Sequence, residues 1–201
     1  MFEKQLDKLE FDGQCPLTMR AWCGAVRNCP NPLGIVTAQQ LDKLEFGEDM
    51  ILMKLENAEL KHIERIVAIS KAAFDSDINV GASAPDAPPD YDSIPWHIQM
   101  KNEGHLLQAV IDGEIVGGAI LFLNKDGENL YVGRIFIDPV HHRKGYGLTL
   151  MKMVETYYSG IKKIKLDTPL WNVRTNALYT KLGYREVERD VEFAYYQKEL
   201  D

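Results

Sequence analysis

The segment Ile135–Gly147 combines residue types that suit phosphate binding. Its sequence, Ile-Phe-Ile-Asp-Pro-Val-His-His-Arg-Lys-Gly-Tyr-Gly, is typical of a strand, a tight turn with two glycines and the start of a helix. Glycine lets a backbone turn sharply and approach a ligand closely. The first turn of a helix leaves N–H groups unpaired, and its dipole favours an anion. Arg143 and Lys144 add positive charge to a chain with net charge −7. The turn is therefore predicted to bind phosphate, with a pyrophosphate as the natural occupant.

Two better-known nucleotide motifs do not describe this turn. The Walker A pattern Gly-x-x-x-x-Gly-Lys-Ser/Thr is absent, and the dinucleotide pattern Gly-x-Gly-x-x-Gly is absent too. Gly145 and Gly147 taken alone also suit an ordinary turn, because glycine is a general turn residue. The pair of glycines needs a second motif before it indicates a family.

That second motif is Asn172–Tyr184, with the sequence Asn-Val-Arg-Thr-Asn-Ala-Leu-Tyr-Thr-Lys-Leu-Gly-Tyr. The segment 142–147 resembles the Gln/Arg-x-x-Gly-x-Gly/Ala signature of the GNAT superfamily of N-acetyltransferases, and 172–184 resembles the family's Asn-x-x-Ala-x-x-x-Tyr-x-Lys-x-Gly-Phe element. The two motifs occur in the family's order, and the resemblance covers roughly residues 49–201. Two positions depart from the pattern. His142 replaces Gln or Arg but can still donate a hydrogen bond, and Thr175 replaces a small Ala.

The resemblance implies that acetyl-CoA is the co-substrate. The backbone amides of residues 143–147 would hold its pyrophosphate, and strand 135–137 would pair with its pantetheine arm. A splay between that strand and strand 163–167 would open a slot for the thioester, and Asn172 would contact the pantetheine or orient the following turn. The implied cofactor-binding residues are Ile135, Phe136, Ile137, His142, Arg143, Lys144, Gly145, Tyr146, Gly147 and Asn172.

Acetyl transfer to a primary amine needs a base and a proton donor. An alkylammonium has a pKa of about 10.4, so only about one molecule in a thousand is neutral at pH 7, and a base or a water relay must take its proton. Asp167, at the end of a predicted strand, is the best-placed carboxylate, although it also suits a turn cap. Tyr179 matches the family's tyrosine and is the predicted donor to the leaving thiolate, although it also suits a packing role. A backbone N–H beside the slot would stabilise the oxyanion.

The stretch 75–92 contains five aspartates and lies where this family commonly shapes its acceptor site. Five carboxylates favour a cationic amine, on a small molecule or on a peptide or protein, although a solvated loop has the same composition. The aspartates are Asp75, Asp77, Asp86, Asp90 and Asp92. An alternative function is a catalytically silent acyl-CoA-binding regulatory module that keeps the phosphate turn without turnover.

The order of the predicted elements indicates a mixed sheet covered by helices. With the resemblance, it predicts an α/β (α+β), GNAT-like fold whose mostly antiparallel sheet has six to seven strands and about four flanking helices. Strands are expected at 51–55, 105–112, 114–124, 130–138 and 162–167, with one or two more in 184–200. Helices are expected at about 58–74, capped by Asn57, and at 94–101, 148–158 and 172–182.

Residues 1–48 read as an N-terminal extension of unknown role before the acetyltransferase-like domain 49–201. The heptapeptide Gln5–Phe11 recurs as Gln40–Phe46. Cys15, Cys23 and Cys29 have neither a Cys-x-x-Cys pair nor a nearby histidine, so no metal is expected.

Composition excludes several functional classes. With 45% hydrophobic and 26% charged residues, the chain is of ordinary globular type. No apolar run approaches the roughly 18 residues of a membrane span, and the N-terminus is too charged for a signal peptide, so a cytoplasmic protein is expected. Net negative charge argues against nucleic-acid binding. The oligomeric state is open, a homodimer included.

Overall fold

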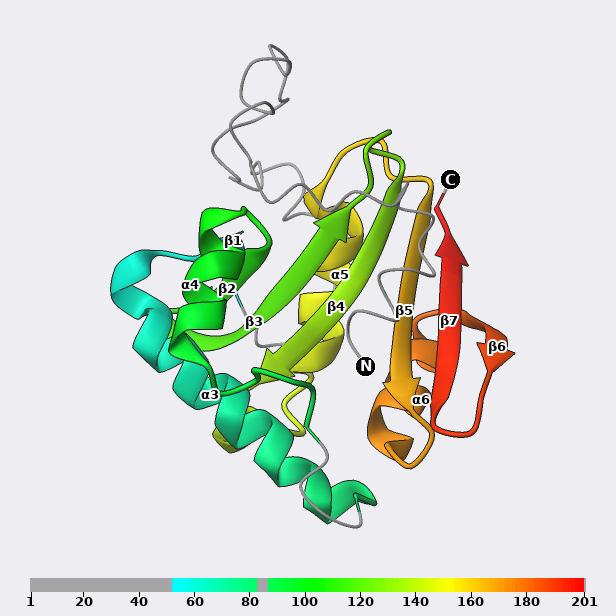
Figure 1. Cartoon of the computed structure of the whole chain (residues 1–201), viewed down its shortest axis with the longest axis horizontal. Coiled ribbons are helices and arrows are strands. Elements are labelled where there is room, and N and C mark those ends of the chain that lie inside the picture. The colour runs from blue at the N-terminus through cyan, green and yellow to red at the C-terminus, as the bar shows by residue number, and fades with distance from the viewer. Residues whose placement is uncertain (1–51, 83–86, 201) are drawn as a thin grey trace.

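The computed structural model describes residues 52–82 and 87–200 (Figure 1). The repeated heptapeptide, the three cysteines and Asp86 lie outside these residues. The predictions made for them, and the proposed boundary at residue 48, therefore stay predictions.

A single seven-stranded sheet forms the centre of the described chain, in the order β1-β2-β3-β4-β5-β7-β6. Its β4–β5 pair is parallel, and the other neighbouring pairs are antiparallel. The predicted mixed, mostly antiparallel sheet is thus confirmed. The strands are β1 Met53–Asn57, β2 Leu106–Ile111, β3 Glu114–Leu123, β4 Asn129–Ile137, β5 Lys163–Pro169, β6 Arg185–Arg189 and β7 Phe193–Glu199.

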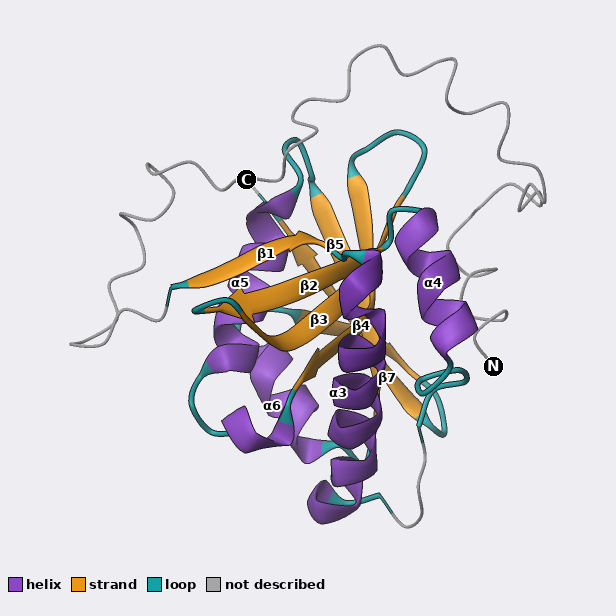
Figure 2. Cartoon of the chain, turned by 90° about the vertical axis from the view of Figure 1, so that its left-hand side faces the viewer, coloured by secondary structure: helices purple, strands orange, loops and turns teal. Residues whose placement is uncertain are grey.

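Four α-helices cover the two faces of this sheet. Figure 2 shows α3 (Ile63–Asp75) and α4 (Ile94–Asn102) on one face, with α5 (Tyr146–Tyr157) and α6 (Val173–Lys181) on the other. Three short 3-10 helices join these elements: η1 Leu60–His62, η2 Ser76–Val80 and η3 Pro139–His141. The number of α-helices in the described chain agrees with the sequence prediction.

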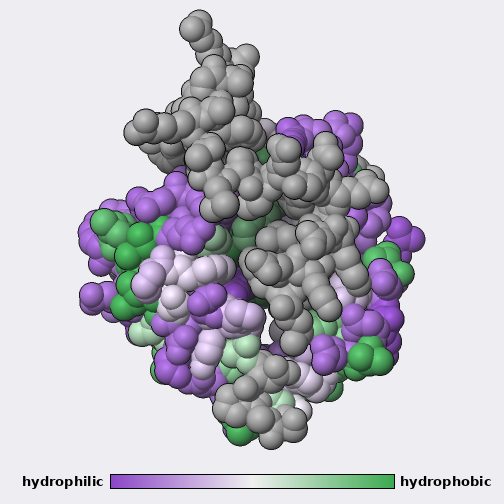
Figure 3. All heavy atoms as spheres, viewed as in Figure 1, coloured by the Kyte–Doolittle hydropathy of each residue, from purple (hydrophilic) through white to green (hydrophobic). Residues whose placement is uncertain are grey.

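Each face of the sheet carries its own apolar core. Leu150, Met151 and Val154 of α5 are fully buried in the core on one face. Ile66 and Ile69 of α3 are fully buried in the core on the other. Burying one such side chain contributes about 1.5–3 kcal/mol, so both helix layers are anchored by their apolar stripes. Figure 3 shows the surface of the molecule from the viewpoint of Figure 1. Hydrophilic and hydrophobic residues are intermixed over the described part of this surface.

The first helix does not begin as predicted. Asn57 is the last residue of β1, where it pairs with Leu107, and the next residue, Ala58, donates its N–H to Leu106 O at 3.0 Å. The β1–β2 ladder therefore takes the residue that was expected to cap the helix. Helix α3 begins at Ile63, after η1, without a side-chain cap. The predicted loop 75–92 is also partly wrong, because η2 lies within it.

Candidate active site

A cavity of about 1040 Å³ lies where β4 and β5 separate. The two strands pair over only four residues, ending at Val132 opposite Leu166. Beyond that point β4 continues to Ile137 and β5 to Pro169 without pairing to each other, and Figure 1 shows the two arrows diverging. The backbone of residues 133–137 therefore lines the cavity along one side.

A β-bulge at Gly133 accompanies this separation. On its other side β4 pairs with β3, and the register changes between Arg134, opposite Ile120, and Val132, opposite Leu121. Gly133 is thus left without a partner in β3. A Cβ at this position would come within 2.7 Å of Phe122 Cε2, so the close approach requires glycine. Because a bulge bends its strand, it gives a local reason for β4 to leave β5 here.

The predicted phosphate turn joins the end of β4 to α5. Gly145 is the N-cap of α5 with φ +81°, and Arg143 also has a positive φ of 64°. The first backbone bond into the helix is donated by Thr149 N–H to Gly145 O at 3.0 Å. Within the described chain, the N–H groups of residues 143–148 donate to no protein acceptor. Unpaired N–H groups at a helix start form an anion site, so the turn fits a pyrophosphate.

His142 opens this turn and is engaged on both ring nitrogens. Nε2 lies 3.0 Å from Ile137 O, and Nδ1 lies 3.2 Å from Arg174 Nη1. Since a guanidinium only donates, Nδ1 accepts and Nε2–H donates, which makes the ring neutral. Burial lowers the pKa of His142, and the charge of Arg174 lowers it further. The ring was expected to donate to the ligand, but in this structure its N–H bonds to the end of β4.

Asn172 caps α6. Its Oδ1 accepts from Thr175 N–H at 3.2 Å, and its Nδ2 donates to Asp77 Oδ2 at 3.2 Å. The side chain is buried, 3% exposed. These bonds fix the start of α6, while a contact of Asn172 with the pantetheine stays a prediction.

Asp77 and Arg174 form a salt bridge that the sequence did not reveal. Arg174 Nη2 contacts Asp77 Oδ1, and both residues line the cavity. Burial raises the pKa of the Asp77 carboxyl, while the charge of Arg174 and the bond from Asn172 lower it. Asp77 is therefore not an open carboxylate of a solvated acidic loop, as its position in the sequence suggested. Arg174 lies within the second motif, and this position was the one sign in the sequence that Arg174 could belong to the site.

Tyr179 faces the cavity from the buried side of α6. Its ring packs against Tyr184 and Tyr196, with centroids 6.0 and 5.8 Å away. Within the described chain its hydroxyl has no hydrogen-bond partner. Burial raises the pKa of the phenol, and the charge of Asp167 raises it further. The packing interpretation and the proton-donor interpretation are therefore compatible.

Asp167 lies on β5, one residue beyond the last pair between β4 and β5. It lines the cavity, and its Oδ1 accepts a hydrogen bond from the Tyr131 hydroxyl. Burial and the neighbouring carboxylate raise the pKa of Tyr131, so this phenol stays protonated. The alternative of a turn cap is wrong, because Asp167 lies within β5 and pairs with Tyr195 of β7.

Apolar and aromatic side chains also line the cavity. Phe74, Pro88, Trp171 and Phe193 lie on its walls. Arg134 of β4 also lines it, with its guanidinium 4.1 Å from the Trp96 ring centroid and a bond to Pro89 O. Burial lowers the pKa of Arg134 to about 10.

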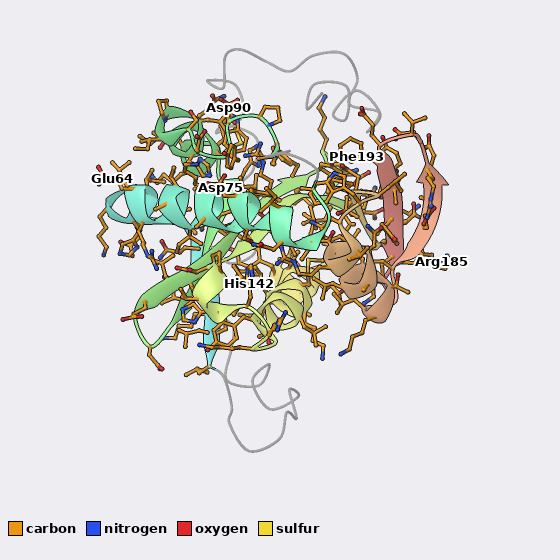
Figure 4. The ribbon with its side chains drawn as sticks, turned by 90° about the horizontal axis from the view of Figure 1, so that it is seen from below. Glu64, Asp75, Asp90, His142, Arg185 and Phe193 are labelled. Atoms are coloured by element: carbon orange, nitrogen blue, oxygen red, sulfur yellow. The ribbon has the colours of Figure 1, made fainter. Side chains whose placement is uncertain are left out.

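Most of the described aspartates of 75–92 do not reach this cavity. Asp75 forms a 2.7 Å salt bridge with Lys71 and accepts from the Tyr91 hydroxyl at 2.9 Å. Figure 4 shows Asp90 and His142 on opposite sides of α3. Of the described aspartates in that stretch, Asp77 alone lines the cavity, and Arg174 compensates its charge. The described aspartates therefore do not gather at the cavity, as their expected role in binding a cationic amine required.

A sequence model of the Acetyltransferase (GNAT) family matches residues 64–184, which is more than half of the chain. The chain belongs to this family. The matched range includes both motifs and every described residue that lines the cavity except Phe193.

Solved structures of other GNAT proteins share the fold. The PaiA N-acetyltransferase of Thermoplasma acidophilum, in complex with coenzyme A, has a TM-score of 0.64 at 15% identity and covers 74% of this chain and 99% of its own. A GNAT-family acetyltransferase of Streptococcus agalactiae has a TM-score of 0.65 at 18% identity, covering 77% and 99%. YncA of Salmonella typhimurium, with acetyl-CoA, has a TM-score of 0.54 at 15% identity, covering 74% and 94%.

A curated relative resembles part of the chain. The uncharacterized protein YrkN of Bacillus subtilis is 31% identical over 85 residues, which cover 42% of this chain and 44% of YrkN. The match thus spans less than half of either protein.

The GNAT fold brings the predicted site residues together. All of them except Lys144 line the one cavity, and Lys144 is exposed, with its Nζ 3.4 Å from His141 Nδ1. Among residues 52–82 and 87–200, no group of three or more His, Cys, Asp or Glu side chains is arranged to hold a metal. No helix in the same part of the chain is long and apolar enough to cross a membrane.

Proposed function

We propose that this protein is an N-acetyltransferase that moves an acetyl group from acetyl-CoA to a primary amine. The observation that carries the proposal is the meeting, at one cavity, of an unpaired β4 edge, a phosphate turn with free N–H groups, and the Tyr179 hydroxyl. The bound coenzyme A and acetyl-CoA of the PaiA and YncA proteins support the same ligand here.

The chain has matching features for two parts of acetyl-CoA, the pyrophosphate and the pantetheine arm. The N–H groups of residues 143–147 would hold the pyrophosphate. The backbone of Ile135, Phe136 and Ile137, which has no partner in β5, would pair with the pantetheine arm. A cavity of about 1040 Å³ is at the upper end of the size of small-molecule sites, as a long cofactor and an acceptor together require.

When bound, the thioester supplies the acetyl group, and two side chains of this protein handle protons. Asp167, beside the point where the strands part, would accept a proton from the incoming ammonium, directly or through water. Tyr179 would donate from its hydroxyl to the leaving thiolate. Because burial raises its pKa, the phenol holds its proton at neutral pH and is always present as a donor.

The walls of the cavity favour an acceptor amine attached to an apolar body. Phe74, Pro88, Trp171 and Phe193 offer apolar surface. Two carboxylates lie on the same walls: Asp77 is neutralised by Arg174, whereas Asp167 accepts from the neutral Tyr131 hydroxyl and keeps its charge for a cationic acceptor. A small-molecule amine and the terminal or side-chain amine of a peptide both meet this description. We therefore propose an amine of either kind, with its nitrogen directed toward Asp167.

The test is thiol release from acetyl-CoA against a panel of amines, for the unchanged protein and for Tyr179→Phe. Release with one class of amine, lowered by the substitution, would establish the activity and its acceptor class. Tight binding of acetyl-CoA without release across a broad panel would instead support a regulatory acyl-CoA-binding module. Failure to bind CoA would overturn both functions.

A further inference from the structure

Arg174 is a cationic side chain of the cavity that neither the phosphate turn nor the proton-transfer pair includes. It lies in the first turn of α6, and its side chain is 40% exposed and lines the cavity. Two contacts anchor its guanidinium, one to Asp77 Oδ1 and one to His142 Nδ1. A guanidinium has five N–H donors, so these two contacts leave further donors for a ligand.

The position of Arg174 is set by tight packing between two distant segments. Asp77 lies on η2, and Asn172, the cap of α6, holds the second carboxylate oxygen of Asp77. Nearby, a Cβ on Gly81 would come within 2.6 Å of Trp171 O, so the two backbones are nearly in contact. Because Asp77 is buried and doubly bonded, it holds the guanidinium in place as a fixed partner.

The contact with His142 places the guanidinium at the beginning of the phosphate turn. His142 is the first residue of that turn, and its other ring nitrogen is bonded to Ile137 O at the end of β4. Asp138, the charged residue that follows Ile137 in the chain, is already paired with Arg65 at 2.8 Å. A planar guanidinium presents its donors in a fork that matches phosphate oxygens. The guanidinium of Arg174 therefore lies beside the first residue of the turn and on the wall of the same cavity, so its remaining donors are available to a phosphate held by the turn.

We propose that Arg174 binds the pyrophosphate of acetyl-CoA, and that Asp77 and His142 are positioning residues that hold its guanidinium. This inference rests on the proposed use of acetyl-CoA. The competing explanation is structural: Arg174 neutralises the buried Asp77 and keeps η2 on α6, without touching the cofactor.

The first experiment compares the binding of CoA and dephospho-CoA by calorimetry. Arg174→Gln should weaken both by about tenfold, the usual effect of losing a charge-assisted hydrogen bond, because both ligands contain the pyrophosphate. Arg185→Gln is the matched control, since it removes the same charge from the exposed strand β6, away from the cavity. An unchanged affinity in Arg174→Gln, or a loss confined to CoA, would overturn the assignment. Failure of the unchanged protein to bind CoA would reject the proposed function itself.

The second experiment removes the phosphates from the donor substrate. S-acetyl-pantetheine keeps the thioester but has no pyrophosphate, so Arg174→Gln should lower kcat/KM about tenfold more with acetyl-CoA than with this donor. Equal losses with the two donors would show that Arg174 acts only on the structure. If Arg174→Gln fails to fold because Asp77 is left as an unpaired buried charge, the double variant Asp77→Asn, Arg174→Gln removes that charge. The double variant should likewise lose about tenfold more kcat/KM with acetyl-CoA than with S-acetyl-pantetheine.

Discussion

The hydroxyl of Tyr179 offers the most direct test of the proposed chemistry. Tyr179→Phe deletes one oxygen and keeps the ring, which packs against Tyr184 and Tyr196 and is 5% exposed. Within the described chain that oxygen has no hydrogen-bond partner to lose. The free energy of unfolding should therefore change by less than about 1 kcal/mol.

The kcat of Tyr179→Phe should fall strongly. A positioned general acid contributes about 10²–10⁴-fold, so kcat should fall at least about 100-fold, which corresponds to roughly 2.7 kcal/mol. KM for acetyl-CoA should change little, because the proton is needed only as the thiolate leaves. The assay is steady-state thiol release, combined with urea unfolding of the same preparations.

Tyr196→Phe is the matched control for this prediction. Tyr196 is equally buried, but its hydroxyl donates to Asn176 Oδ1 at 2.8 Å and does not line the cavity. This variant should lose about 1 kcal/mol of stability and keep its kcat. If both variants lost activity to the same extent, or if Tyr179→Phe lost stability instead of rate, the role assigned to Tyr179 would be refuted.

Three further predictions concern Asp167, the glycines of the phosphate turn and three histidines, of which His97 is buried and His105 and His142 are partly buried. Asp167→Asn keeps an acceptor for the Tyr131 hydroxyl but removes the charge, so kcat should fall at least about tenfold with little change in unfolding; an unchanged kcat would exclude Asp167 as the base. Gly145→Ala should lower the free energy of unfolding in urea by about 1 kcal/mol and weaken CoA binding, because Gly145 has φ +81°. Gly147 lies in the helix, and a Cβ there would meet nothing nearer than Leu178 at 3.9 Å. Gly147→Ala should therefore leave the free energy of unfolding unchanged. Burial lowers the pKa of His97, His105 and His142 below the unfolded value of about 6.5, so the unfolded state binds more protons just below that pH. Stability should therefore fall as pH drops from 7 to 5 in urea titrations, and a flat profile would contradict those environments.

The parts of the candidate site that lie within short, continuous motifs could be predicted from the sequence. The phosphate turn at 142–147 and the motif at 172–184 each carry their own spacing, and the fold places both on one cavity. Tyr179 was found because its distance along the chain from Asn172 and Gly183 is part of the second motif. The helix start at Ile63 was missed, because Asn57 has the local preference of a cap while the β1–β2 ladder competes for the same residue.

Contacts across long sequence separations were not predictable in the same way. Asp77 looked like one of five aspartates in an acidic loop, and it lies 97 residues from the arginine that neutralises it. Asp167 suited a turn cap as well as a base, until its pairing with Tyr195 placed it within β5. In both cases the carboxylate could be recognised as a candidate from the sequence. Its role depended on a partner, Arg174 or Tyr195, that lies on another element.

The order of the elements and the residues of the phosphate turn could be predicted from the sequence, because they depend on hydrophobic periodicity and on local spacing. The family was indicated by the resemblance of the two motifs to the GNAT signatures, and the family model confirms it. Tertiary structure alone decided where β4 leaves β5, since that depends on the bulge at Gly133 and on the ring of Phe122 packed against it. It also decided that Asp77, Arg174 and His142 form one connected group. Hydrogen bonds and salt bridges act over a few ångströms in space, and only the folded chain brings residues so distant in sequence to that range.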